Sequence, residues 1–567
     1  MNSAFAMLVA LVMAFVGYYW YARYIDRSVI KVDPDKATPA KMYMDGVDFL
    51  PTSRHVLFGY QFKSIAALGP VVGPIVALQW GWLAGFLWIV LGTLFIGWVH
   101  DYSSAILAMR NDGQSFGAMA YRLISPRGRS ILLAFIYFYL ILIIAAFADI
   151  VAKVLMKPGV PMAVLGLMVL GVVTGYLIYR ARVDILIITV VMVVLSFFAV
   201  WFGTVAPIQG SYDVWLLYTL FFCYLGATLP IWLYAQPINY IAFYLVFIGM
   251  IGAILGIFIG RPDFTAPAFT SWSVAGLGPL WPVLFVTIAC GAISGWHGLL
   301  SSSGTARQLE KETDTRYVVA GSMFSEMVLG MLALIIAAAT FAEFGKYKEA
   351  LAKTGPAGVF AGGMSSLLSY LGIPADFGAA FAGAMFVILA ITVLQLAVRF
   401  ARVATAEIAG DRSALLRNQH VGTLIALILV AILVKTGTWS YLWVLFGGSN
   451  QLMAALALLM VSIWLVSQRK SFVWAYYPMW FMLVTTVVAL GFKVVELVTK
   501  VSGLLAGTAK PAAGKTLGME VAGNLIAAGI ALFLIVAALI LASDGLKGFF
   551  RQRAEMAKGQ ASAAPAD

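Results

Sequence analysis

The residue types best suited to binding chemistry gather in one glycine- and serine-rich stretch, 281–316, which reads WPVLFVTIACGAISGWHGLLSSSGTARQLEKETDTR. If residues 281–303 form one helix, a rotation of about 100° per residue brings five polar side chains within an arc of about 80°. These five are Thr287, Cys290, Ser294, His297 and Ser301. Such a face offers hydrogen bonds to a solute and oxygen ligands to a cation, although Ser and Thr often bond only a neighbouring helix. We therefore predict a substrate site that includes Ser294 and His297.

Three ionisable side chains fall within hydrophobic stretches, where charged groups are costly and are functional candidates by default. They are Lys63, Asp101 and Glu326. Asp101 and Glu326 lie at a similar depth from the same membrane face, so each is either a proton carrier or one half of a structural ion pair. Lys63 either takes part in coupling or extends its long stem to the membrane interface. We assign all three, together with Ser301 and Ser302, to ion coupling.

The composition shows what kind of scaffold must hold these groups. The chain has 567 residues, of which 62% are hydrophobic and 11% charged, and its mean hydropathy is +0.94. A soluble chain of this length would carry far more charge. The hydrophobic runs predict an all-α membrane protein with about fifteen spans of about 20 residues each. The runs are 4–24, 56–79, 83–109, 130–155, 161–179, 184–204, 214–236, 237–260, 281–303, 318–343, 376–402, 420–436, 440–466, 474–499 and 520–545. The first lacks the features of a cleaved signal peptide and is expected to be retained.

Two regions of the predicted spans are interrupted by Gly and Pro. They read VLFGYQFKSIAALGPVVGPIVALQ at 56–79 and YLGATLPIWLYAQPIN at 224–239. Proline breaks the helical hydrogen-bond ladder, and free backbone groups at membrane depth are tolerated only inside protein or along a polar cavity. Interrupted spans at matching places in two halves are typical of secondary transporters. We predict that the two breaks lie side by side near the membrane midplane. The residues assigned there to substrate binding are Gly69, Pro70, Gly73, Gly226 and Gln236.

The net charge of +12 follows a membrane pattern, which argues against a nucleic-acid partner. Alternating the spans from an external N-terminus puts most of the 37 Lys and Arg residues on the cytoplasmic side, as the positive-inside rule requires. We therefore expect the N-terminus outside and the C-terminus in the cytoplasm, with a disordered tail over 546–567. The sequence predicts no cofactor and no metal centre. Its two Cys residues, Cys223 and Cys290, are expected to be buried without a disulfide.

Four motifs together resemble the carbon-starvation (CstA-type) family of bacterial membrane transporters. They are PTSRHVLFGYQFKSIAALGPVVGP, GWVHDYSSAILAMRNDGQSFG, VTIACGAISGWHGLLSSSGTARQLEKETDTR and FGGSNQLMAALAL, and they span about 50–460. The resemblance implies a multi-pass protein of the bacterial inner membrane that imports a small organic nutrient. Pyruvate taken up with a proton and peptides are the two substrates assigned to the family, so the coupling cation is expected to be H⁺, with Na⁺ as the alternative.

The resemblance also implies a LeuT-like core of two inverted five-helix repeats, at about 56–204 and 214–402. Residues 1–55 then precede the core and 403–545 follow it as additional helices. In this assignment 56–79 is core helix one, 214–236 is core helix six and 281–303 is core helix eight. Core helix eight supplies hydroxyl ligands to a cation in such folds, which implies a possible Na⁺ site at Ser294, Ser301 and Ser302.

The chain departs from better-known members of that family at several positions. Tyr60-Gln61 stand where those members have two His residues, and Ile238-Asn239 stand where they have Arg-Asp. Gln395 replaces an Asp, and Lys63 is additional, close to where related folds hold a sodium ion. A lysine ammonium there could take the place of that ion and couple transport to protons. The sequence does not assign a role to the other departures.

Two alternatives to pyruvate import stay open at this point. A peptide importer is the nearer one, since both substrates are assigned to the family. An intramembrane enzyme is remote, because Ser294 and His297 on one helical turn would not point at each other's reactive atoms. No His-Glu-x-x-His pair or Cys/His metal cluster occurs in the sequence either.

Overall fold

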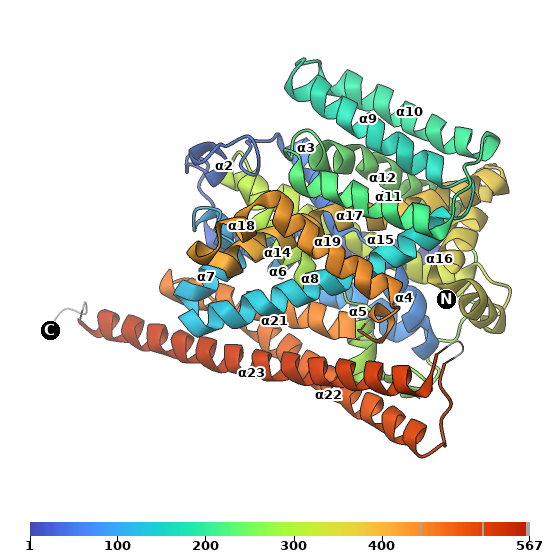
Figure 1. Cartoon of the computed structure of the whole chain (residues 1–567). Helices are drawn as coiled ribbons and strands as arrows, with labels where there is room; N and C mark the ends of the chain where they lie inside the picture. The colour runs from blue at the N-terminus through green and yellow to red at the C-terminus, as the bar shows by residue number, and fades with distance from the viewer. Residues whose placement is uncertain (443–444, 513–514, 563–567) are drawn as a thin grey trace.

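The computed structural model describes residues 1–442, 445–512 and 515–562, and it is helical almost throughout (Figure 1). Within these residues, 11 helices are long and apolar enough to cross a membrane, or up to 12 when one bent pair is counted as a span. This confirms the polytopic all-α class but gives fewer full spans than predicted. Three predicted spans account for the difference. Tyr212–Thr228 and Gln419–Lys435 have 17 residues each, and the span at 281–303 is interrupted.

The elements of the first part of the chain are α1 Ser3–Val16, α2 Pro39–Met42, α3 Arg54–Ile65, α4 Gly69–Ala77, α5 Trp82–Gly92, α6 Trp98–Met109, α7 Phe116–Leu123, α8 Pro126–Leu155, α9 Pro161–Tyr179, α10 Ile185–Val205, α11 Tyr212–Thr228 and α12 Ala235–Gly260. Those of the second part are β1 Ser273–Val274, β2 Gly278–Pro279, α13 Phe285–Thr287, α14 Gly295–Ser303, α15 Gly321–Ala339, α16 Phe344–Ser369, α17 Ala375–Ala409, α18 Ala414–Arg417, α19 Gln419–Lys435, α20 Trp439–Leu442, α21 Phe446–Ser467, α22 Val473–Leu505 and α23 Leu517–Ser562.

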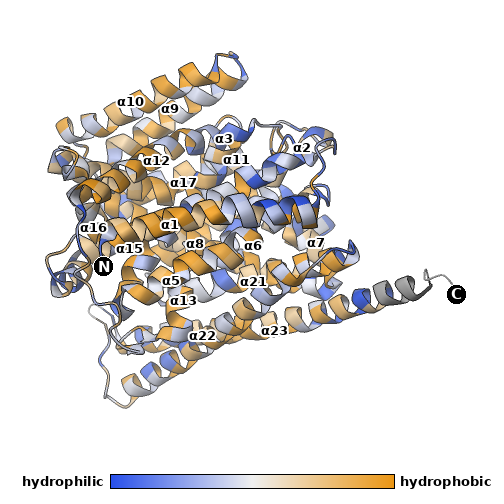
Figure 2. Ribbon diagram, turned by 180° about the vertical axis from the view of Figure 1, so that it is seen from behind, coloured by the Kyte–Doolittle hydropathy of each residue, from blue (hydrophilic) through white to orange (hydrophobic). Residues whose placement is uncertain are grey.

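The hydropathy of the ribbon separates the two ends of the helix bundle (Figure 2). Hydrophilic residues gather around α2 and α7, at the end where Arg110 pairs with Glu312 at 2.6 Å and Lys41 pairs with Glu310 at 3.4 Å. We call this the basic end. The flanks between the ends are apolar, as lipid-facing helix surfaces must be. The hairpin of α9 and α10 lies at the periphery of the bundle.

The predicted break in the first interrupted span is confirmed. Helix α3 ends at Ile65 and α4 begins at Gly69, with a bend of 42° between the two halves. Pro70 sits at the start of α4, where a residue without an N–H group is best tolerated. At the other side of the break, the ammonium of Lys63 donates to the carbonyl of Ala66 at 3.1 Å. The position of Pro70 and the bond from Lys63 to Ala66 thus both favour a break in the helix here.

The prediction of a second break at 224–239 is wrong. Helix α11 ends at Thr228, a short connection follows, and α12 begins at Ala235 as a helix of full length. The connection lies at the basic end, because Arg399 donates to the carbonyls of Gly226 and Leu229 there. Pro230 therefore lies in a turn between two helices, with Gly226 in the end of α11 and Pro237 in the start of α12, and the region has no intramembrane break.

The second break lies instead in the span predicted as one continuous polar helix, 281–303. Helix α13 ends at Thr287, and the chain is non-helical until α14 starts at Gly295. Ile288 has ψ 65° and Ser294 has φ −143° and ψ 130°, so the five-residue polar arc on one helix is also wrong. Side chains of neighbouring helices satisfy the freed carbonyls. Trp88 and Gln451 donate to Phe285, Trp88 also to Ile288, and Thr93 to Gly291.

The two breaks pack directly against each other. A Cβ atom at Gly69 would collide with Cys290, and one at Gly73 would lie 2.6 Å from the carbonyl oxygen of Thr287. A Cβ at Gly291 would lie 3.5 Å from Cα of Pro70. The first broken span therefore does lie beside a second one, as predicted, but its partner is 280–303 and not 214–236.

The C-terminal helix corrects the predicted disordered tail. Helix α23 continues to Ser562 and extends beyond the rest of the bundle (Figure 1). At about 1.5 Å per residue its length is about 70 Å, more than twice the hydrocarbon thickness. The Ala, Lys, Gln and Arg residues beyond 545 are strong helix formers, which the compositional prediction of disorder did not weigh. Residues 563–567 lie outside the described residues.

We expect Gly73→Ala to destabilise the protein by about 1–3 kcal/mol, because the added methyl group meets backbone atoms of the second break that have no room to shift. The thermal unfolding midpoint in detergent measures the effect. Gly491→Ala in α22 is the matched control, since no atom of the described residues lies within 4 Å of a Cβ there. An equal midpoint for both variants would contradict the close packing of the two breaks.

Candidate functional site

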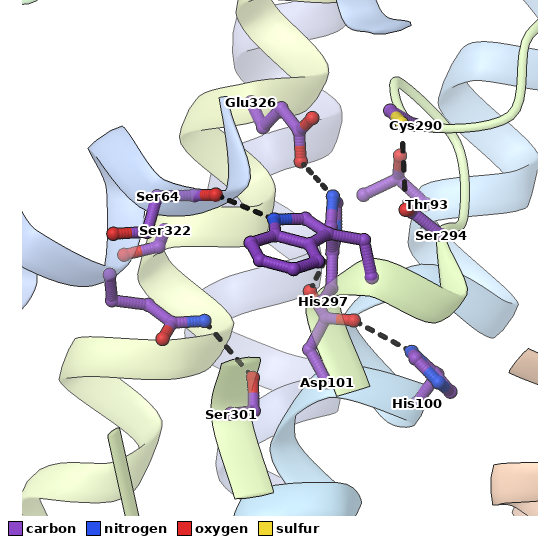
Figure 3. Close-up of polar contacts among 12 residues, drawn as sticks. Ser64, Thr93, His100, Asp101, Cys290, Ser294, His297, Ser301, Ser322 and Glu326 are labelled. Carbon is purple, nitrogen blue, oxygen red and sulfur yellow. Dashed lines mark hydrogen bonds and ion pairs between the residues drawn. The ribbon is translucent and has the colours of Figure 1, made fainter. Parts of the chain in front are cut away.

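Four buried ionisable side chains form a continuous chain beside the two breaks (Figure 3). Asp101 of α6 accepts from Nδ1 of His100 at 2.8 Å through one carboxylate oxygen and lies 3.0 Å from Nδ1 of His297 through the other. Nε2 of His297, on α14, lies 3.3 Å from Oε2 of Glu326 on α15. His297 thus stands between two carboxylates that belong to different helices.

The arrangement is suited to carrying one proton. A neutral imidazole has one N–H group and can donate to only one carboxylate, whereas a protonated imidazole can donate to both. The His297–Glu326 pair is within ion-pair distance but is poorly aligned, and within the described part of the chain neither Glu326 oxygen has a hydrogen-bond partner. A buried carboxyl group without partners favours its neutral form. Of these four side chains, Glu326 is therefore the one whose charge depends most on the proton that it shares with His297.

Lys63 lies inside the protein and does not reach the membrane interface, so the interface alternative for this residue is wrong. Its side chain is fully buried, and its ammonium bonds the Ala66 carbonyl inside the first break. Its helix, α3, packs against α15, which carries Glu326. Lys63, Asp101 and Glu326, predicted separately as coupling residues, are thus brought into one region.

The second break is tied to its neighbours by one amide. Oδ1 of Asn450, at the start of α21, accepts from the hydroxyl of Ser294 at 3.1 Å, the backbone N–H of Trp296 at 3.1 Å and the hydroxyl of Tyr139 at 2.5 Å. The indole of Trp296 donates in turn to the carbonyl of Ser64, at 2.7 Å. These bonds join α8, α21 and both broken spans around the same point.

The predicted sodium ligands do not share a partner. The hydroxyl of Ser294 donates to Asn450, Ser301 accepts from Gln61 at 3.0 Å, and Ser302 donates to its own helix at Leu299. Since a sodium site needs several oxygens that converge on one point, these contacts give it no support. Among the residues that the structure describes, no group of three or more His, Cys, Asp or Glu is placed to hold a metal ion.

Two predicted substrate residues lie away from the breaks. Gly226 ends α11 against Gln395 of α17, and Gln236 donates to Thr52 and Gln308 near the basic end. Both were assigned from a break that the structure does not have. The remaining predicted substrate residues, Gly69, Pro70, Gly73, Ser294 and His297, lie on the two broken spans.

A cavity of about 260 Å³ reaches the breaks from the end of the bundle opposite the basic end. Gly73, Thr287 and Gly447 line its inner part, and Lys493 and Glu496 of α22 lie at its side. At the basic end, Asp48 bonds Arg399 at 2.7 Å and lies 3.6 Å from Arg402. Burial raises the pKa of Asp48, but the two guanidinium groups outweigh this and hold the pKa below its usual value.

Sequence reasoning missed three contributors to the site. His100 had a signal, since it stands next to Asp101 within a span, and Asn450 had one as an amide within an apolar helix. The pairing of Asp48 with Arg399 had none, because 351 residues separate the two partners in sequence.

The fold and the site together define a multi-pass membrane protein with two broken spans around a buried imidazole–carboxylate chain. The chain belongs to the carbon starvation protein CstA family, whose model matches residues 2–348 and 339–489. It is 36% identical over 361 residues to the pyruvate/proton symporter BtsT of Escherichia coli K12, with 61% of this chain and 50% of that protein covered. It is 27% identical over 507 residues to the peptide transporter CstA of Bacillus subtilis 168, with 81% and 84% covered.

The peptide transporter CstA of Escherichia coli K12 is 33% identical over 351 residues, and the match covers 59% of this chain and 50% of that protein. The chain thus spans about half the length of the two Escherichia coli relatives that it matches. Among solved structures, a manganese transporter of Eremococcus coleocola is similar over 90% of this chain and 99% of its own, with 15% identity and a TM-score of 0.49.

We expect Asp101→Ala to lower the free energy of unfolding by about 3–5 kcal/mol, because it leaves two buried imidazoles without their shared acceptor. Asp213→Ala, which removes one partner of the exposed pair with Lys435, should cost less than about 1 kcal/mol. Thermal unfolding in detergent compares the two variants. Similar losses would mean that the buried chain does not hold α6 to α14.

Proposed function

We propose that the protein is a secondary active transporter that imports a small carboxylate such as pyruvate across the bacterial inner membrane by proton symport. The observation that carries the proposal is the buried chain His100–Asp101–His297–Glu326, which lies against both broken spans and changes its pairing with one proton. Such a chain of titratable side chains can take up a proton from one side of the membrane and release it to the other. A change in its pairing alters the packing of the helices that carry it. The name of one relative, the pyruvate/proton symporter of Escherichia coli K12, favours the same activity.

We propose a LeuT-like core whose helix six is the broken span at 280–303. The first repeat then comprises α3/α4, α5/α6, α8, α11 and α12, and the second comprises α13/α14, α15, α17, α19 and α21. This assignment replaces those of 214–236 as helix six and 281–303 as helix eight. It is supported by the position of a broken span at the start of each set and by the packing of the two breaks against each other. Helices α1, α9, α10, α22 and α23 lie outside the repeats.

In this proposal the basic end faces the cytoplasm, and the N-terminus is outside. The cavity at Gly73 and Thr287 is then an external vestibule, and the Asp48–Arg399 pair closes the cytoplasmic side. The described conformation thus admits solute from outside. Transport requires the opposite arrangement, in which the vestibule closes and the pair at Asp48 opens.

The proton enters by the vestibule and is held between His297 and Glu326. Its arrival makes Glu326 neutral or His297 cationic, and either change alters the electrostatic balance with Lys63 across the first break. We propose that the Lys63 ammonium, bound to the Ala66 carbonyl, occupies the place that a sodium ion takes in other transporters. Coupling would then depend on H⁺ and not on Na⁺.

Peptide import is the second candidate, because two of the three relatives described above are named as peptide transporters. A peptide and pyruvate share a carboxylate, so the same site could serve either. The difference in volume between the two solutes decides which one passes.

We expect proteoliposomes to take up labelled pyruvate when a proton gradient is imposed, and excess unlabelled dialanine or trialanine to leave the uptake unchanged. A sodium gradient alone should drive none. Uptake measured against protein-free liposomes tests this. Competition by the peptides would favour the second candidate, and sodium-driven uptake would contradict proton coupling.

We expect Glu326→Gln to abolish uptake driven by a proton gradient, because the amide cannot release a proton, while exchange of labelled for unlabelled pyruvate at equal pH continues. Glu349→Gln is the matched control, since Glu349 forms only exposed pairs with Lys346 and Lys353. The ratio of gradient-driven uptake to exchange is the measured quantity. Lys63→Ala tests in the same assay whether Lys63 is the coupling group instead. If only Lys63→Ala loses gradient-driven uptake, the coupling group is Lys63 and not Glu326.

A further inference from the structure

A second, smaller cavity lies at the basic end and is not part of the break region. The loop before α3, the middle of α3, the end of α14 and α17 enclose it. Its lining residues are Asp48, Tyr60, Ile231, Ser303, Gly304, Arg307, Arg399, Phe400 and Val403. Its volume is about that of a water molecule, so it is a closed site in the described conformation.

The cavity carries an excess of positive charge. Arg307 and Arg399 line it together with a single carboxylate, Asp48, and Arg402 lies 3.6 Å from that carboxylate. Asp48 is therefore shared by several guanidinium groups. Arg307 donates through Nε to the carbonyl of Gly113 and lies over the ring of Phe49. Burial lowers the pKa of Arg307, whereas the nearby carboxylates of Asp48, Glu407 and Asp45 raise it.

A buried hydroxyl at the cavity wall also lacks a partner. Tyr60 is fully buried, and in the described residues its hydroxyl has no hydrogen bond. The amide of Gln308 lies beside it, makes no hydrogen bond of good geometry to it, and bonds Gln236 and the carbonyl of Gly304. A Cβ at Gly304 would come within 3.1 Å of the hydroxyl, so only glycine keeps the space beside it free. A hydroxyl without a hydrogen bond beside two guanidinium groups, Arg307 and Arg399, is suited to a carboxylate ligand.

We infer that this cavity is a cytoplasmic binding station for the carboxylate of the transported solute, held by Arg399, Arg307 and the hydroxyl of Tyr60. The inference rests on the proposed transport function and adds the recognition chemistry of its cytoplasmic side. An arriving carboxylate competes with Asp48 for Arg399. Displacement of Asp48 frees the loop before α3 from α17, so arrival of the solute opens the cytoplasmic exit.

The loop is built to respond in this way. Arg399 holds Asp48 of the loop and the carbonyls of Gly226 and Leu229 at the same time. The next residues of the loop bond the segment after α14, through Leu50 to Arg307 and Thr52 to Gln308. One guanidinium group thus joins the entrance of the first broken span to α11 and α17. A ligand that replaces Asp48 releases the loop from Arg399, whereas the bonds from Arg399 to the carbonyls of Gly226 and Leu229 use its other nitrogens and can remain.

The test compares Tyr60→Phe with Tyr234→Phe. Each removes a buried hydroxyl that makes no hydrogen bond in the described chain, but Tyr234 does not line the cavity. With inside-out vesicles, we expect Tyr60→Phe to raise the KM for pyruvate at the cytoplasmic face about tenfold, since a hydrogen bond to a charged group is lost, with little change in kcat. Tyr234→Phe should keep the wild-type KM, and pyruvamide, which has no carboxylate, should compete with pyruvate in none of the three proteins.

Arg307→Gln should raise the same KM at least as much, and unfolding midpoints show whether either variant is misfolded. Dialanine and dialanine amide replace pyruvate and pyruvamide in a second arm, which distinguishes the two sources of the carboxylate. Transport by the wild type with an unchanged cytoplasmic KM in Tyr60→Phe would overturn the inference and leave the transport function standing. If the wild type transports neither solute, the transport function fails. Pyruvate binding to the purified protein then tests whether the cytoplasmic cavity binds a carboxylate. Equal affinity of wild type and Tyr60→Phe for pyruvate would overturn the inference.

Discussion

The structure depends on one constraint, which is that two stretches of non-helical backbone lie buried in a membrane protein and every polar group freed there needs a partner. The partners are polar side chains that donate to the freed carbonyls. Lys63 satisfies the carbonyl of Ala66, while Trp88, Thr93 and Gln451 satisfy carbonyls of the second break. Trp88 and Thr93 lie on the span of α5 and α6 and Gln451 lies on α21, so the second break also fixes how these helices pack against it.

The same constraint links the breaks to the titratable chain. Asn450 holds Ser294 and the backbone of Trp296, and the next residue is His297, whose ring meets Asp101 and Glu326. The N-terminal turn of α14 is thus held at one side by an amide and at the other by two carboxylates. A change of protonation at His297 acts on a helix end whose position the backbone bonds define. Protonation and backbone geometry are therefore coupled at the scale of one helical turn.

The sequence predicted the class, the first break and the residues Lys63, Asp101, His297 and Glu326, because each rests on a local signal. Proline and glycine inside an apolar run, or a charge within it, are visible without knowledge of the fold. The second break was misplaced because its signal was weaker. Residues 288–294 contain glycine and serine but no proline, whereas Pro230 lies in a turn between helices and Pro237 in the first turn of α12. Proline marks a change of direction, and only packing decides whether that change occurs at membrane depth.

The hydrogen-bond partners of the serine hydroxyl groups, compared with those of the ionisable side chains, favour a proton over sodium as the coupling ion. Sodium needs several oxygen ligands around one point, yet Ser294, Ser301 and Ser302 face three different partners. A proton needs only a titratable pair, which His297 and Glu326 supply. Lys63 places an amino group at the first break, and its protonated form would repel a second cation there. The serines then serve to hold helices together, and the ionisable chain is the part of the site whose charge can change during a transport cycle.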